Sequence, residues 1–270
     1  MFARLNHVAI VSEKYPLLNG FYQSLFGLKP SKTTGPQSGV DIGDGYVGLN
    51  INPRKGGRPA GLDHFGVEVE DVEKCFAKMR EKYPHAGWVQ RPSNRPFAGI
   101  TANDPDGNVF DLSQKNMKNR TGAYVENTGV TGDRWISHVA IRTVRPDEMA
   151  RFYVDVLELS EQNAAHGDPN HYLTDGHMTL VVIPWRIDNY AGQSIMPTGV
   201  DHFGFTVESV EKVKADIDTL VGLNPVMHTI PLGMGPEGKA RLELAQRQCP
   251  MADYFISDPD YNLIAIREAS

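Results

Sequence analysis

The chain has 270 residues, of which 40% are hydrophobic and 22% are charged, and its formal net charge is −6. This length suits two domains of ordinary size, and the composition excludes a low-complexity protein. No run of about 18 apolar residues is present, so we expect no membrane span. The mild acidity offers no attraction for nucleic acid or for an anionic membrane surface. Residues 1–11 lack the features of a signal peptide, which predicts a cytoplasmic protein.

A repeated pattern occurs four times along the chain. The segment LNHVAIV from Leu5 is similar to ISHVAIR from Ile136. The segment LDHFGVEV from Leu62 is similar to VDHFGFTV from Val200. Each alternating run is followed by apolar residues at helical spacing and then by short apolar runs between Gly, Pro and Asp. The sequence therefore predicts four βαβββ modules.

The modules divide the chain into two predicted domains. We expect an α+β fold with a first domain at residues 1–118 and a second at residues 134–270. Residues 119–133 between them are polar, rich in Gly and Asn and without periodicity, which is typical of a linker. Either half is long enough to bury its own core.

The two cysteines lie in different halves and form no CxxC pattern. Neither a disulfide framework nor a zinc knuckle is therefore predicted. Cys75 lies on the apolar face of a predicted helix, which favours a buried and inert thiol. The pattern assigns no chemistry to Cys249.

Three motifs make the chain resemble the vicinal oxygen chelate superfamily. They are the HVAI and DHFG strand openings, the first helix that closes at Leu25–Leu28, and DPDGNVFDL from Asp104. That superfamily includes glyoxalase I, extradiol ring-cleaving dioxygenases, methylmalonyl-CoA epimerase and bleomycin or fosfomycin resistance proteins. The resemblance covers nearly the whole chain. It implies that the four modules pair into two cup-shaped mixed sheets, with a metal held in a cup by first and last strands.

His7, His64 and Asp111 are the candidate metal ligands. Two imidazoles and one carboxylate suit a first-row divalent ion that also binds substrate. Asp111 stands between apolar residues of an expected buried strand, where a carboxylate is costly unless a cation or hydrogen bonds satisfy it. The alternative is that the histidines are ordinary hydrogen-bonded strand residues and that Asp111 caps a loop. Their joint occurrence at family positions favours a metal, with iron(II) first and Mn²⁺, Zn²⁺ or Ni²⁺ as alternatives.

Strand alternation predicts which neighbours share a face with these ligands. It places His7 on the face of Leu5 and His64 on the face of Leu62. Family members with four ligands carry a Glu in the last strand of the first module, and here that place falls near Leu49. The predicted site therefore has three ligands, as in the extradiol dioxygenases. Asp111 replaces the usual Glu, which shortens the reach of the carboxylate.

The second half departs from this pattern. His138 and His202 repeat the histidine positions, but DPDYNLIAI has Ala265 where DPDGNVFDL has Asp111. Glu268 is expected on the opposite face of that strand. The sequence thus predicts an incomplete metal site, and residues 134–270 become a structural partner or a substrate-shaping lid. Two-domain extradiol dioxygenases usually keep their metal in the C-terminal domain, so this chain differs from them.

Arg91 and Arg95 are the candidate substrate-binding residues. Arginine recognises carboxylates and phosphates through paired hydrogen bonds, and these two residues lie where the family lines its cup. The alternative is solvated loop charge, which we prefer for Arg54, Lys55 and Arg58. The implied ligand is a small molecule with vicinal oxygens, either anionic or catecholic.

Three functions remain open at this point. The first is an iron(II) dioxygenase of the extradiol ring-cleaving type, although the acid–base His and the Tyr of such relatives have no counterpart, so no catalytic residue is assigned. The second is a glyoxalase-like lyase or isomerase, which the missing Glu weakens because relatives use it as the base. The third is a ligand-binding or resistance protein without catalysis. Neither nucleic acid nor membrane is an expected partner, and a homo-oligomer is compatible with the family.

Overall fold

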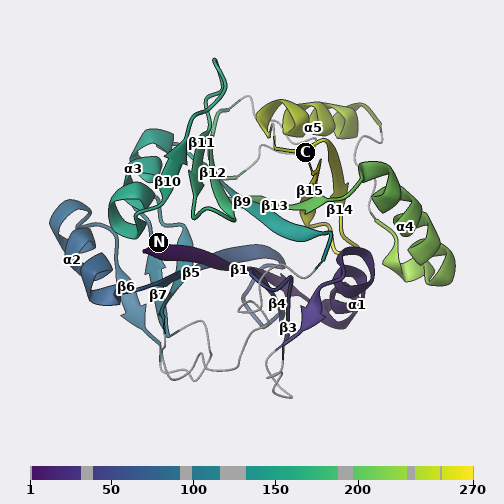
Figure 1. Cartoon of the computed structure of the whole chain (residues 1–270), viewed down its shortest axis with the longest axis horizontal. Helices are drawn as coiled ribbons and strands as arrows, with labels where there is room; N and C mark the ends of the chain where they lie inside the picture. Colours follow the sequence, from purple (N-terminus) through teal and green to yellow (C-terminus); the bar gives the residue numbers. More distant parts are fainter. Residues whose placement is uncertain are drawn as a thin grey trace.

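The computed structural model describes residues 2–31, 39–91, 99–115, 132–187, 197–229, 235–249 and 251–269. Within these residues the chain forms two mixed sheets, one from each half (Figure 1). The predicted pairing of modules into two sheets is confirmed. Most of the predicted linker, residues 119–131, lies outside the described residues. None of the helices in the described part of the chain combines the length and the apolar character needed to cross a membrane.

The N-terminal half forms an eight-stranded sheet of order β2-β3-β4-β1-β5-β8-β7-β6. Its two modules meet where the first strands, β1 and β5, pair antiparallel. The last strands, β4 and β8, pair parallel with β1 and β5, respectively. The elements are β1 (Ala3–Ser12), α1 (Tyr15–Phe26), β2 (Lys29–Pro30), β3 (Val40–Gly43), β4 (Gly48–Pro53), β5 (Gly61–Val69), α2 (Val72–Lys82), β6 (Trp88–Gln90), β7 (Ile100–Asn103) and β8 (Val109–Gln114).

The C-terminal half forms a seven-stranded sheet of order β10-β11-β12-β9-β13-β15-β14. Its fourth module departs from the others, because within the described residues the helix α5 stands between α4 and β14. The sequence predicted no helix there, since α5 buries only Leu244 and so lacks an apolar stripe. The elements are β9 (Trp135–Thr143), α3 (Pro146–Leu157), β10 (Ser160–Gln162), β11 (His171–Thr174), β12 (Thr179–Pro184), β13 (Gly199–Val207), α4 (Val210–Leu223), the 3₁₀ turn η3 (Pro225–Met227), α5 (Gly235–Gln248), β14 (Tyr254–Ser257) and β15 (Leu263–Glu268).

Capping groups in the sequence set the ends of the helices that follow the first strands. The Asp71 carboxylate accepts hydrogen bonds from the backbone N–H groups of Glu73 and Lys74 at the start of α2. Ser209 plays the same part at the start of α4. Helix α1 ends at Gly27, whose φ of 69° lies in the left-handed region that glycine adopts without steric cost.

The two halves share one hydrophobic core. Helix α1 of the first half lies beside α4 of the second, and α2 lies beside α3 (Figure 1). Phe26 of α1 stacks on Phe205 of β13 with ring centroids 3.7 Å apart. Tyr153 of α3 packs against Phe65 and Phe110 of the first sheet. Either half is long enough to bury a core of its own, but the described residues form one hydrophobic cluster that spans both halves.

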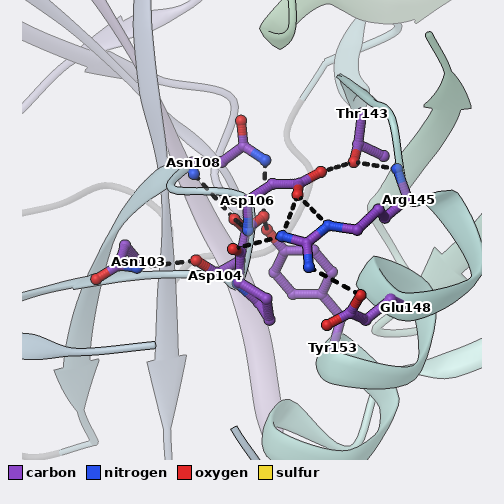
Figure 2. A network of polar contacts seen from close by, with 9 residues as sticks. Asn103, Asp104, Asp106, Asn108, Thr143, Arg145, Glu148 and Tyr153 are labelled. Atoms are coloured by element: carbon purple, nitrogen blue, oxygen red, sulfur yellow. Dashed lines mark hydrogen bonds and ion pairs between the residues drawn. The ribbon is translucent and has the colours of Figure 1, made fainter. Parts of the chain in front are cut away.

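The DPDGN turn between β7 and β8 fastens the first half to the second (Figure 2). One oxygen of Asp104 accepts hydrogen bonds from two backbone N–H groups of the turn. Its other oxygen accepts from the side chain of Asn108 and, at 2.8 Å, from the hydroxyl of Tyr153 in α3. Asp106 of the same turn accepts a hydrogen bond from Arg145, which precedes α3. This motif therefore has a structural role in docking the halves.

The DPDYN turn of the second half makes the mirrored contacts. Asp258 accepts a hydrogen bond from the hydroxyl of Tyr22 in α1 at 2.7 Å. Asp260 accepts one from Ser12 and forms an ion pair with Lys14 at 3.3 Å. The interface consequently repeats its contacts about an approximate two-fold relation between the halves.

Two further aspartates bridge the halves through backbone groups. Asp44 lies in the turn before β4 and accepts a hydrogen bond at 2.8 Å from the N–H of Ile136 in β9. Asp175 lies in the equivalent turn before β12 and accepts one at 2.7 Å from the N–H of Leu5 in β1. Each half thus fixes the first strand of the other, which is the strand that carries a candidate ligand.

Candidate metal centre

A β-bulge precedes each histidine of the first half. In the pairing of β1 with β5, Asn6 is the extra residue before His7, and Asp63 is the extra residue before His64. A bulge shifts the alternation of side chains by one residue. Leu5 accordingly lies in the core and not on the face of His7, and Leu62 packs against the same core. The faces predicted from strict alternation were wrong at these two positions.

The bulged residues orient the imidazoles. Nδ1 of His7 donates to Oδ1 of Asn6 at 2.8 Å, and Nδ1 of His64 donates to Oδ2 of Asp63 at 2.6 Å. Such a bond fixes the tautomer and leaves Nε2 as the atom available to a metal. Asp63 in turn forms an ion pair with Arg58. The Asn-His and Asp-His dipeptides of the sequence were the available sign of this arrangement.

Gly66 makes room for the ring of His7. A Cβ atom placed on Gly66 would lie 1.9 Å from Cε1 of His7, far inside contact distance. His7 and Gly66 are direct partners in the β1–β5 pairing. The glycine of the DHFG motif is therefore required by the histidine on the neighbouring strand.

The three predicted ligands converge in the cup of the first sheet. His7, His64 and Asp111 come from β1, β5 and β8, all three are buried, and their ligand atoms lie within 4.8 Å of one another. Nε2 of His64 lies 3.2 Å from Oδ2 of Asp111. Oδ1 of Asp111 accepts a hydrogen bond from Thr101 at 2.9 Å, which holds the carboxylate in place. The structure thus brings the set together, and metal binding by it stays a prediction.

The electrostatics of this cluster reflect the His64–Asp111 pair. Burial disfavours the charged form of His64, but hydrogen bonds to Asp111 and Asp63 raise its pKa to about 9. Burial likewise opposes ionisation of Asp111, but its hydrogen bond to His64 lowers its pKa below the usual value. The pKa of Asp63 is raised by burial and lowered more strongly by His64 and Arg58, to about 2. A divalent ion would replace the proton that His64 and Asp111 hold between them.

Of the two candidate substrate-binding arginines, the structure describes Arg91 and not Arg95. Nη2 of Arg91 lies 3.7 Å from Oδ1 of Asp111, so Arg91 borders the ligand cluster. Arg95 lies outside the described residues. Arg54 pairs with Glu13 on the surface, in keeping with a solvated loop charge. Arg58, which was expected to be such a charge, instead supports the aspartate that orients His64.

A second cluster of three donors lies in the C-terminal cup. His138 of β9 and His202 of β13 converge with Cys249, which follows α5, and their ligand atoms lie within 4.8 Å of one another. Ala265 pairs with Gly204 as Asp111 pairs with Gly66, so β15 has no carboxylate at this position. The sequence predicted two imidazoles without an anionic ligand here, and Cys249 is a possible donor that this prediction did not include.

Sequence reasoning missed Cys249 for a definable reason. It lies 47 residues after His202, at the end of a helix that has no counterpart among the described residues of the first half. The repeat, which located every other ligand, therefore carried no information about it. Glu268 accepts a hydrogen bond from the N–H of Val210 and takes no part in the cluster, as expected.

Both clusters stand in a chain whose sequence matches one family along most of its length. The profile of the Glyoxalase/Bleomycin resistance protein/Dioxygenase superfamily matches residues 4–112 and again residues 135–266. The chain belongs to this superfamily. The two matched segments coincide with the two sheets, each with its own cup. No curated protein sequence matches the chain significantly.

Solved structures of the superfamily share this fold at low sequence identity. A catechol 2,3-dioxygenase is similar with a TM-score of 0.62 and 13% identity, over 100% of this chain and 88% of that one. A Mn(II)-bound glyoxalase from Novosphingobium aromaticivorans has a TM-score of 0.61 and 14% identity, over 99% and 82%. A fusion of a xylose isomerase-like TIM barrel with 4-hydroxyphenylpyruvate dioxygenase has a TM-score of 0.62 and 14% identity, over 99% of this chain but 49% of that one.

The register of β4 locates the fourth ligand position of the superfamily. Asp111 pairs with Gly66, the second residue after His64. The equivalent second residue after His7 is Ala9, and its partner in β4 is Asn50. By this register, the fourth ligand position that was expected near Leu49 corresponds to Asn50, whose side chain is an amide.

Proposed function

We propose that the chain is an iron(II)-dependent dioxygenase of the extradiol ring-cleaving type, with His7, His64 and Asp111 as the metal ligands. The observation that carries this proposal is a buried set of two imidazoles and one carboxylate, with a neutral amide at the fourth ligand position. Two histidines and one carboxylate with open positions are typical of non-haem iron(II) oxygenases.

The donor spacing fits a single ion. Ligand atoms at bond lengths of roughly 2.0–2.2 Å from one ion lie about 3.0–3.4 Å apart. Nε2 of His64 and Oδ2 of Asp111 are 3.2 Å apart, within that range. Asn6 and Asp63 hold the histidine rings, and Thr101 holds the carboxylate, so the donors are preorganised. An iron(II) ion there would supply the activation of dioxygen and of a chelating substrate.

A glyoxalase-like lyase or isomerase is the alternative, and the likeness of the fold to a Mn(II)-bound glyoxalase favours it. Proton transfer through an enediolate needs a base beside the substrate. The side-chain amide of Asn50 has no basic group, so it cannot take the part of the superfamily Glu. This difference is why we place the dioxygenase first.

Arg91 is the proposed substrate-binding residue for which the structure provides support. It borders Asp111 at 3.7 Å, and 29% of its side chain is exposed, so its guanidinium faces both the cluster and solvent. A guanidinium in that place suits a carboxylate or an ionised catechol oxygen. Arg95 is proposed for the same role on its sequence position alone.

The wild-type chain purified without oxygen and loaded with iron(II) tests the proposal. We expect bound iron, and oxygen uptake with catechols that exceeds the uptake with α-keto or α-hydroxy acids. Asp111→Ala should lose both iron and oxygen uptake, whereas Asp218→Ala, at an exposed site of α4, should retain them. Bound metal with isomerisation and no oxygen uptake would support the glyoxalase alternative. Absence of both metal and turnover would leave a ligand-binding protein.

The fourth ligand position offers a separate test. Asn50→Glu would add a carboxylate at the superfamily position and occupy a coordination site that the proposed reaction leaves open. We expect tighter retention of Mn²⁺ or Zn²⁺ against a chelator, and oxygen uptake lower by roughly tenfold or more, the size of effect that changes around a metal produce. Asn50→Gln, which lengthens the side chain without adding charge, is the matched control. Unchanged oxygen uptake in Asn50→Glu would contradict the assignment of an open site.

A further inference from the structure

The third donor of the C-terminal cluster is a thiol, whereas the third donor of the first cluster is a carboxylate. Ala265 occupies the strand position of Asp111, and Cys249 Sγ instead lies 3.3 Å from Nε2 of His202 and 3.9 Å from Nε2 of His138. All three donor residues are buried. The anionic donor is therefore supplied from outside the repeated strands.

The two histidines are oriented as in the first cup. Bulges in the pairing of β9 with β13 leave Ser137 and Asp201 as the extra residues before the histidines. Oδ2 of Asp201 accepts from Nδ1 of His202 at 2.6 Å, and Oγ of Ser137 lies 3.1 Å from Nδ1 of His138. The Nε2 atoms of both histidines therefore point toward Cys249. This second orienting shell is a usual companion of metal-binding histidines.

The segment that carries the thiol is also held. Arg142 pairs with Asp201 at 3.1 Å and donates at 2.8 Å to the side chain of Gln248, the residue before Cys249. Asn170 donates to the backbone oxygen of Gln248 at 2.8 Å. The thiol and the imidazoles are therefore parts of one connected buried network.

The distances match those of a tetrahedral zinc site. With Zn–S near 2.3 Å and Zn–N near 2.0–2.1 Å, sulfur and nitrogen ligands lie about 3.6 Å apart. The two distances from Cys249 Sγ, 3.3 and 3.9 Å, stand on either side of that value. A thiolate with two imidazoles is a softer donor set than the first cluster, and it suits zinc.

The space beside the donors admits a single small ligand. A cavity of about 20 Å³, lined by His202, Cys249 and residues of α5, is large enough for about one water molecule. Leu242 and Ala245 of α5 pack on the apolar cluster that contains Cys249, so the helix covers this cup. This cavity has no room for a molecule the size of a catechol.

We propose that His138, His202 and Cys249 bind a zinc ion, with water as the fourth ligand, which fastens α5 over the C-terminal cup. The zinc centre is separate from the proposed iron centre, because its ligands come from the other sheet. It depends on no assumption about the reaction of the first cup.

Cobalt substitution in the full chain tests the zinc centre. We use His64→Ala/Asp111→Ala, which removes the first cluster, and load it with Co²⁺ alone. One equivalent of cobalt should bind with a near-ultraviolet sulfur-to-cobalt charge-transfer band. Adding Cys249→Ser should abolish the band, whereas adding Cys75→Ser should preserve it, because Cys75 lies buried in α2 away from the cluster. A variant that fails to bind cobalt, or binds it without the band, contradicts the proposal.

Thiol protection in the wild-type chain avoids any dependence on the folding of variants. Zinc should slow the alkylation of Cys249 by iodoacetamide by roughly tenfold or more, because the metal occupies the thiolate that is the nucleophile. Peptide mass spectrometry identifies which cysteine has reacted. Alkylation of Cys249 at the same rate with and without zinc would overturn the proposal and leave a reactive Cys–His pair instead.

Discussion

Asp104→Ala should lower the free energy of unfolding by about 3–5 kcal/mol, the range for breaking a buried hydrogen-bond network. The carboxylate accepts from two backbone N–H groups, from Asn108 and from Tyr153 (Figure 2). Alanine leaves all four donors without this acceptor, and each unsatisfied buried donor costs about 1–3 kcal/mol before neighbouring groups relax. Urea denaturation followed by circular dichroism measures the change. Because the halves share a core, one transition is expected.

Other variants distinguish the contribution of the turn from that of the hydrogen bond between the halves. Tyr153→Phe removes only the hydrogen bond that Tyr153 donates to Asp104 and should cost about 1–2 kcal/mol. Asp258→Ala, in the mirrored turn, should match Asp104→Ala because its contacts are equivalent. Asp218→Ala, at an exposed site, should stay within about 0.5 kcal/mol of the wild type. If Asp104→Ala changed stability no more than this control, the docking role of the motif would be wrong.

Gly66→Ala should remove His7 from the first cluster. The added Cβ would lie 1.9 Å from Cε1 and 2.2 Å from Nδ1 of His7. Since β1 and β5 are paired at this point, the ring must rotate away or the strands must part. We expect iron affinity to fall by about 100-fold or more, beyond the 10–100-fold typical of outer-shell changes, because a ligand itself is displaced. Overpacking should also cost about 1–3 kcal/mol of stability.

Three further variants make this prediction specific. Gly56→Ala is the control, because no atom lies within 4 Å of an added Cβ there. Gly204→Ala meets His138 in the same manner and should affect the second cluster while sparing iron at the first. His7→Ala/Gly66→Ala should recover stability, because the clash is gone, without recovering iron. Full iron binding by Gly66→Ala would refute the argument.

The sequence was sufficient where the relevant interactions are local or repeated. Alternation and helical spacing predicted the first strand of each module and the helix that follows it, because burial of one face imposes those periods on the residues. The repeat aligned His7 with His64, and the DPDGN and DPDYN turns aligned Asp111 with Ala265. The observed register, in which these two residues face Gly66 and Gly204, agrees with that alignment.

The faces predicted for Leu5 and Leu62 were wrong because β-bulges form where the two strands pair. The bulges at Asn6 and Asp63 exist only when β1 and β5 lie side by side, so alternation within one strand cannot reveal them. Because of these bulges, Leu5 and Leu62 pack in the core, and Asn6 and Asp63 contact the histidines. The sequence could place the fourth ligand position only near Leu49, since the residue itself depends on the pairing of β4 with β1.

By itself, the sequence determined the four modules, the superfamily and the candidate ligands of the first cup, because each follows from a pattern of neighbouring residues that recurs along the chain. Only the tertiary structure decided that the halves share one core, that the DPDGN motif docks them, and that Cys249 meets His138 and His202. Those features depend on contacts between segments far apart in the chain. No local pattern encodes such contacts, because they form only when whole sheets and helices pack together.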